Sequence, residues 1–140
     1  MVRPLPESKR GKKLRKNPRL QRSEVARIGE DVAEAFLRKK GFLVLERNWR
    51  SKRWGELDII AQESDVLVFV EVKTRVGGKF GAPEEAVTFY KRRALKRAAQ
   101  YYKTMHPNLS EALRIDVISI LLDGETGAPK QIKHLPNIPI

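Results

Sequence analysis

Three charged residues interrupt apolar stretches of this sequence: Asp58 lies within the segment 55–62, and Glu71 and Lys73 lie within 66–75. Both segments are rich in the aliphatic and β-branched residues that favour strands. A charged side chain in such a strand costs free energy unless it is paired or binds a metal. Because strand side chains alternate between faces, Glu71 and Lys73 should point the same way, about 7 Å apart.

A short turn at 63–65 connects the two segments and predicts an antiparallel hairpin. A register that pairs Asp58 with Glu71 would be centred within this turn. We therefore expect the hairpin to bring both carboxylates and the Lys73 ammonium to one place on the sheet.

Two carboxylates at such a place would repel each other unless a cation lies between them. Mg²⁺ or Mn²⁺ suits the pair, because these ions bind carboxylate oxygens together with water and substrate phosphate oxygens. The ion would polarise a phosphoryl group and activate a water for in-line attack. Lys73 would orient or help deprotonate that water, or offset the charge of the transition state. The alternative is an ordinary salt bridge between Lys73 and one of the acids.

The hairpin needs further elements to hold it. Helical spacing of apolar residues predicts a first helix at 23–40, with Ser23 as its N-cap, no capping box, and Gly41 at its end. A strand at 42–50 precedes the hairpin, and the short connections predict an antiparallel meander of three strands.

A second helix is predicted at about 84–104, opened by Pro83 or Glu84. Strands at 112–122 and near 130–135 follow and should close the chain as a hairpin. The order of elements is therefore α-β-β-β-α-β with a C-terminal hairpin, which indicates an α/β domain. The apolar face of the second helix is expected to contain Ala86, Val87, Tyr90, Ala94, Leu95, Ala98 and Tyr101.

Charge divides the chain of 140 residues unevenly. The net charge is +12, and residues 1–22 contain nine Lys or Arg side chains and one acid. We interpret 1–22 as a basic disordered arm and 23–140 as one folded domain. A polyanion, with nucleic acid the commonest, is the partner that this charge favours. A solvated tail without a specific partner is the alternative.

Several classes of protein are disfavoured. The chain contains no cysteine, which excludes disulfides, thiolate zinc sites and cysteine nucleophiles and fits a cytoplasmic location. No apolar stretch approaches the roughly 18 residues that span a bilayer, so no membrane partner is expected. The first 22 residues lack the apolar region of a secretory signal.

The segments 55–61, 67–75 and 80–87 read GELDIIA, LVFVEVKTR and FGAPEEAV. Together they closely resemble the bacterial YraN-type family of predicted endonucleases, which is distantly similar to archaeal Holliday-junction resolvases. The resemblance covers about 22–140. It implies a restriction-endonuclease-like core, with a mixed central sheet flanked by helices, and a divalent-metal site that cleaves DNA, including branched or junction DNA.

Carried over by residue, the resemblance matches Asp58 and Glu71 with the metal-binding acids and Lys73 with the catalytic lysine. Glu30 matches a first-helix glutamate that is a further candidate ligand for the metal or its water. Its alternative is an ordinary surface acid. Glu56 lies two residues before Asp58 and is a candidate either to support the metal ligands or to replace one of them. The alternative is a charge at the rim of the site.

Basic side chains at three places are candidates for nucleic-acid binding. For Lys91, the alternative is a solvated helix face. For Trp49 and Trp54, which flank the basic turn, the two alternatives are stacking on unpaired bases and packing of the hairpin. The candidates are Arg75 in the third strand, Lys91 in the second helix, and Arg50, Lys52 and Arg53 in the turn.

Three functions remain open at this stage. One is a Mg²⁺- or Mn²⁺-dependent DNA endonuclease, and another is a module with a nuclease-like fold that binds nucleic acid or a DNA-processing partner and does not cut. The third is an interaction protein unrelated to nucleic acid. Whether the chain is an enzyme is therefore undecided by the sequence. A homodimer is expected for an enzyme that cuts two strands symmetrically.

Overall fold

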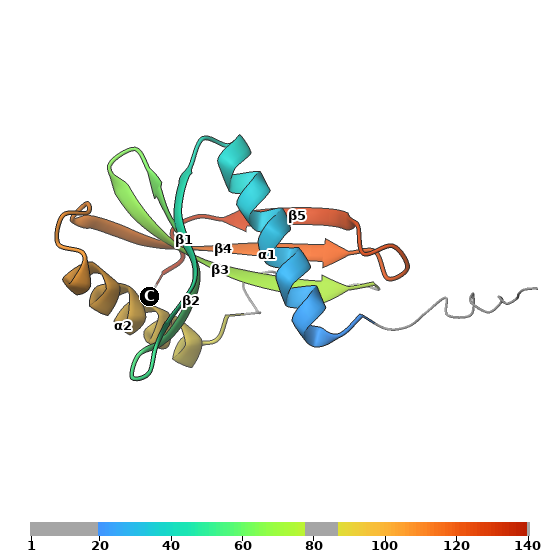
Figure 1. Cartoon of the computed structure of the whole chain (residues 1–140), viewed down its shortest axis with the longest axis horizontal. Coiled ribbons are helices and arrows are strands. Elements are labelled where there is room, and N and C mark those ends of the chain that lie inside the picture. The colour runs from blue at the N-terminus through green and yellow to red at the C-terminus, as the bar shows by residue number, and fades with distance from the viewer. Residues whose placement is uncertain (1–19, 78–86, 140) are drawn as a thin grey trace, which may run out of the picture.

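The computed structural model describes residues 20–77 and 87–139. These residues form two helices and five strands, whose arrangement can be followed in Figure 1. Their bounds are α1 Arg22–Lys39, β1 Leu43–Ser51, β2 Gly55–Glu63, β3 Val66–Val76, α2 Phe89–Met105, β4 Ala112–Leu122 and β5 Pro129–Leu135.

The five strands form one mixed sheet in the order β1-β2-β3-β4-β5. The first three strands are an antiparallel meander. β4 runs parallel to β3, since the connection through α2 returns the chain to the same end of the sheet. β5 closes the sheet as an antiparallel hairpin with β4. The predicted α/β class, with a mixed sheet flanked by helices and a C-terminal hairpin, is confirmed.

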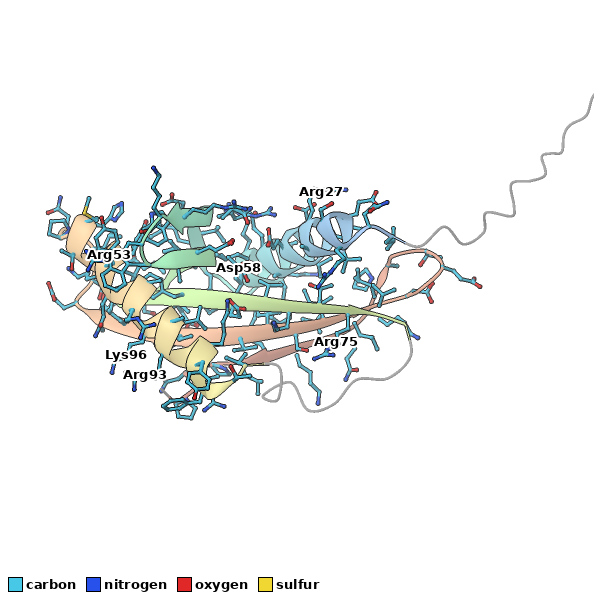
Figure 2. All side chains as sticks on the ribbon, turned by 90° about the horizontal axis from the view of Figure 1, so that it is seen from below. Arg27, Arg53, Asp58, Arg75, Arg93 and Lys96 are labelled. Carbon is cyan, nitrogen blue, oxygen red and sulfur yellow. The ribbon has the colours of Figure 1, made fainter. Side chains whose placement is uncertain are left out.

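The two helices cover opposite faces of the sheet (Figure 2). One apolar cluster packs α2 against the sheet and contains Leu57, Phe69 and Val117. The other packs α1 against the sheet and contains Ile59 and Val70. The strands in the middle of the sheet are therefore buried on both faces, which explains why their sequences are nearly continuous apolar runs.

The beginning of α1 corrects one prediction. Its N-cap is Gln21, not Ser23, and the Glu24 carboxylate accepts a hydrogen bond from the Gln21 backbone N–H at 3.0 Å. The prediction that no capping box is present was wrong, because Glu24 lies three residues after Gln21 rather than after Ser23. The predicted arm 1–22 falls mainly on 1–19, outside the described residues, and Arg22 is already helical.

The second helix also begins later than predicted. Thr88 is its N-cap, and the Thr88 hydroxyl accepts a hydrogen bond from the Lys91 backbone N–H at 3.1 Å. Val87 therefore lies before the helix, and 83–86 lie outside the described residues. The predicted face was rotated: Tyr90 is 80% exposed, and the buried residues of α2 are Leu95, Ala98, Ala99 and Tyr102.

Candidate active site

A break in strand alternation creates the site. Arg47 pairs with Ile59 in the ladder between β1 and β2 and reaches acids on α1. Trp49 pairs with Leu57 and packs on the α2 side. Two positions that are two residues apart would share a face in a regular strand. The alternation fails because Asn48, between them, adopts a left-handed conformation with φ 54°.

Asp58 lies opposite this break, at the point where β2 and β3 stop pairing. Their ladder runs from Glu63 and Val66 near the turn as far as Ile59 and Val70. The next pair along this register would be Asp58 with Glu71, so the predicted register is confirmed. Instead of continuing the ladder, the Asp58 carboxylate accepts a hydrogen bond from the Val72 backbone N–H at 2.8 Å.

The Asp58 and Glu71 carboxylates form a close acidic pair. Glu71 is only 5% exposed. Burial, followed by repulsion from Glu71, raises the pKa of Asp58 to about 6, although the Val72 N–H and Lys91 oppose the rise. Burial and the neighbouring carboxylate both disfavour the ionised form of Asp58, and a cation bound between the two acids would reduce their repulsion.

The lysine nearest this pair is not the predicted one. Among the described residues, it is Lys91 that pairs with Glu71, with the Nζ atom 3.6 Å from Oε2. Lys73 is half-buried and, by strand alternation, lies on the same face of β3 as Glu71. Lys91 was predicted to contact a phosphate, and the structure gives it the additional role of a counter-charge to the buried acid.

A cleft of about 910 Å³ lies between α1 and the sheet, and Asp58 and Glu71 are among the residues that line it. Glu30 of α1 lines this cleft together with Asp58 and Glu71. Burial and the charge of Asp58 raise the pKa of Glu30, against hydrogen bonds from Asn48 and Arg47. The three acids predicted as metal ligands therefore share one cleft and influence one another electrostatically.

The same three acids are not gathered into one cage. Over 20–77 and 87–139, no three His, Cys, Asp or Glu side chains lie close enough together to hold a metal ion. Glu30 is instead directed toward Arg47, at 3.4 Å. The structure thus brings Asp58 and Glu71 together as a pair, and the metal-binding role of Glu30 stays a prediction.

Arg47 is a cleft residue that sequence reasoning missed. Its guanidinium pairs with Asp31 at 2.8 Å, Glu34 at 3.0 Å and Glu30 at 3.4 Å. It therefore ties β1 to α1 and fixes the acidic face of the helix. The signal was present, because Glu30 and Glu34 lie one turn apart on the same helix face and call for a nearby cation.

The predicted rim residues fall into two groups. Glu56 and Arg50 both line the cleft and form an exposed ion pair at 3.8 Å, which favours the interpretation of Glu56 as a rim charge. Lys52, Arg53 and Arg75 are exposed, as nucleic-acid contacts would have to be.

The two tryptophans are explained by packing. Trp49 and Trp54 are partly buried against the α2 cluster. Both rings lie beside Tyr101, with centroid distances of 6.1 and 6.2 Å. The packing interpretation of these residues is therefore the one that the structure supports.

Comparison with known proteins gives the family. Residues 29–120, which include the acidic pair and both lysines, match the family described as "Uncharacterised protein family UPF0102". The chain belongs to this family. The resemblance to the YraN-type family is thereby confirmed.

Relatives of the UPF0102 chain match it over most of their length. A "UPF0102 protein" of Syntrophomonas wolfei is 46% identical over 115 residues, which are 81% of this chain and 96% of the relative. Another, from Dictyoglomus turgidum, is 40% identical over 118 residues, or 84% and 98% of the two chains. These names are family labels and state no activity.

A solved structure, a fdxN element excision controlling factor protein from Anabaena variabilis, aligns with 76% of this UPF0102 chain and 98% of its own. The TM-score is 0.36 and the identity is 16%, values too low to support an argument. In the part of the chain that the structure describes, no helix is long and apolar enough to cross a bilayer.

The family match begins at a residue that sets the shape of the site. A Cβ atom at Gly29 would lie 1.9 Å from the Thr74 hydroxyl oxygen, so a larger residue there would push α1 away from β3. The side chain of Thr74 points toward α1, opposite to the face of Lys73. This close approach of helix and strand brings the next residue, Glu30, to the cleft.

Proposed function

We propose that this UPF0102 protein is a divalent-metal-dependent endonuclease that hydrolyses phosphodiester bonds in DNA. The observation that carries the proposal is the adjacent pair of half-buried Asp58 and buried Glu71 in one cleft, where burial and repulsion from Glu71 raise the pKa of Asp58 to about 6. Burying two adjacent carboxylates is unfavourable for folding, and perturbed acids of this kind cluster at functional sites.

The donor set fits Mg²⁺ or Mn²⁺. Both ions prefer hard oxygen ligands, and Mg²⁺ is commonly held by one or two carboxylates with water and substrate phosphate completing the shell. Asp58 and Glu71 would supply those two carboxylates. When bound, the ion supplies a Lewis acid for the phosphoryl group and lowers the pKa of a bound water.

The protein's own residues provide the remaining requirements. Hydrogen bonding from the Val72 N–H fixes the Asp58 carboxylate in orientation. Lys91, beside Glu71, supplies a positive charge that opposes the rise in the pKa of Asp58. Lys73, on the same strand face as Glu71, would orient the attacking water or offset the charge that develops on the phosphoryl oxygens.

Positive charge in the cleft supports DNA as the substrate, because Arg22, Arg27 and Arg50 line it together with the acids. Phosphate groups bound by these arginines would pass close to the acidic pair. A second group of cations, Arg53, Lys96 and Arg93, lies near α2 at one end of the molecule, with Asp58 in a more central position (Figure 2). Branched or junction DNA is the substrate class that we propose to test first. We expect the protein in the cytoplasm.

The test is cleavage of end-labelled junction, flap, duplex and single-stranded DNA in Mn²⁺. We expect a cut in at least one branched substrate, and loss of that cut in Asp58→Ala and Lys73→Ala. Asp65→Ala is a matched control, since Asp65 is an exposed acid in the turn between the same two strands. If every substrate is bound but stays intact, the enzymatic proposal is wrong.

A second candidate function is a DNA-binding module that does not cut. Two observations favour it: the described residues contain no group of three His, Cys, Asp or Glu side chains that could hold a metal ion, and Lys91 already neutralises part of the charge of Glu71. Tight binding without cleavage in the assay above would support this alternative. A homodimer, which would present two sites to two strands, is a separate proposal that light scattering tests.

A further inference from the structure

Two aromatic side chains at the start of α2 are left in solvent. Phe89 is 62% exposed and Tyr90 is 80% exposed. Their ring centroids are 5.6 Å apart and their planes are inclined by 77°, so the rings form an open corner. The tryptophans and Tyr102 instead pack on the α2 side of the sheet. The exposed pair therefore contributes little to the core.

Cations surround this aromatic pair. The Arg93 guanidinium lies 5.6 Å from the centre of the Phe89 ring. Lys91 follows Tyr90 directly and reaches the buried Glu71 at 3.6 Å. Across Phe89–Met105, α2 contains six Lys or Arg residues and no acidic residue. An aromatic surface beside concentrated positive charge is complementary to a polyanion that also presents flat rings.

We infer that Phe89 and Tyr90 form a stacking site for an unpaired nucleobase of DNA, next to the phosphate that the acidic pair would cleave. Bases inside a continuous duplex are stacked on their neighbours and offer only their edges in the grooves. The rings can be used only by a base that has left the stack. The inference deepens the proposed function, on which it rests, by naming the substrate class: DNA with an unpaired base beside the cleaved bond.

A protein partner explains the same features less well. Exposed aromatic and arginine side chains also occur at the centres of protein interfaces. Such a partner would need an acidic surface to match α2, because that helix has no acid of its own. DNA supplies the ring and the negative charge in a single ligand, and the adjacent Lys91 links the rings to the acidic pair.

The experiment measures binding in EDTA, so that affinity is read without cleavage. The probes are three labelled oligonucleotides: a continuous duplex, the same duplex with one bulged 2-aminopurine, and a single strand. We expect Phe89→Ala/Tyr90→Ala to bind the bulged duplex and the single strand about tenfold more weakly, while affinity for the continuous duplex changes less than about twofold. The wild type should also alter the 2-aminopurine fluorescence, and the double variant should not.

Single variants sharpen the test. Tyr90→Phe keeps the ring and should retain wild-type affinity for the bulged duplex, whereas Tyr90→Leu removes it and should not. Met105→Ala is the matched control, because Met105 is 58% exposed at the other end of the same helix. Circular dichroism of each variant verifies that the fold is retained.

Other outcomes overturn the inference. Equal loss of affinity for all three probes would show a general contact with DNA, and unchanged affinity would show no contact at the rings. A change from dimer to monomer in sedimentation would show that a second copy covers them. If the bulged duplex is bound through the rings but nothing is cleaved in Mn²⁺, the proposed cleavage fails while the stacking site stands.

Discussion

Replacing Asp58 by asparagine should stabilise the fold at pH 8 and abolish DNA cleavage. Burial, together with the charge of Glu71, raises the pKa of Asp58 from 3.8 to about 6. A shift of roughly two units, at about 1.4 kcal/mol per unit, corresponds to about 3 kcal/mol of stability. Asparagine is neutral at all these pH values, and its Oδ1 atom can still accept the hydrogen bond from the Val72 N–H.

The stability difference between the wild type and Asp58→Asn should grow with pH, because folding raises the pKa of Asp58. Because the folded-state pKa of Asp58 lies above the unfolded-state value, its contribution to stability is fully present below pH 3.8 and is lost as the pH rises through about 6. The wild type should therefore be less stable than Asp58→Asn by up to about 3 kcal/mol at pH 8. Near pH 4 the two proteins should unfold at nearly the same urea concentration.

Urea unfolding followed by tryptophan fluorescence at five pH values between 4 and 8 measures this difference.

Asp116→Asn is a control that should change stability in the opposite direction. Burial alone would raise the pKa of Asp116, but hydrogen bonds from His134, Arg114 and the Asn137 backbone hold it below the usual value. Loss of the Asp116 charge in Asp116→Asn should destabilise the fold at pH 8 by roughly 3–5 kcal/mol. A stability gain in Asp58→Asn that is absent or independent of pH would refute the reasoning.

Three more predictions concern the lysines, the helix contact and the arm. Lys73→Ala should lower the cleavage rate by about 10²–10³-fold with little change in melting temperature. Lys91→Ala should also shift the pH–rate profile upward, because the Lys91 charge lowers the pKa of Asp58; similar profiles for both variants would contradict this. Gly29→Ala should destabilise the fold by about 1–3 kcal/mol through its clash with Thr74, and Thr74→Ala in the same chain should recover part of the loss in urea unfolding. Deletion of 1–22 should flatten the dependence of DNA affinity on salt, measured by anisotropy, since nine basic residues are removed; an unchanged slope would show that the arm does not bind DNA.

The acidic pair was predictable because it depends on local rules. Alternation in β3, the short turn at 63–65 and antiparallel pairing fix which residue lies opposite Glu71, and the ladder has this register. The strand bounds are also local, since β-prone runs are separated by turn residues. β4 pairs in parallel with β3 because α2 connects the two strands.

The surroundings of the pair were not predictable, because they depend on contacts between distant segments. The left-handed conformation of Asn48 changes the face of every later residue in β1. The strand-like sequence of this segment does not show where the alternation breaks. Lys91 reaches Glu71 because α2 packs on the face of the sheet that Glu71, by strand alternation, shares with Phe69. The buried face of α2 follows from its packing on the sheet, where Leu95, Ala98, Ala99 and Tyr102 join the apolar cluster that contains Phe69.

The most direct measurement is Mn²⁺ binding, followed by electron paramagnetic resonance in titrations of the wild type, Asp58→Asn, Glu71→Gln and the control Asp65→Asn. We predict one bound Mn²⁺ per chain in the wild type and in the control, and weakening by at least tenfold in each of the other two variants. Equal binding in all four proteins, or no binding in the wild type with bulged DNA present, would contradict a metal site at the acidic pair.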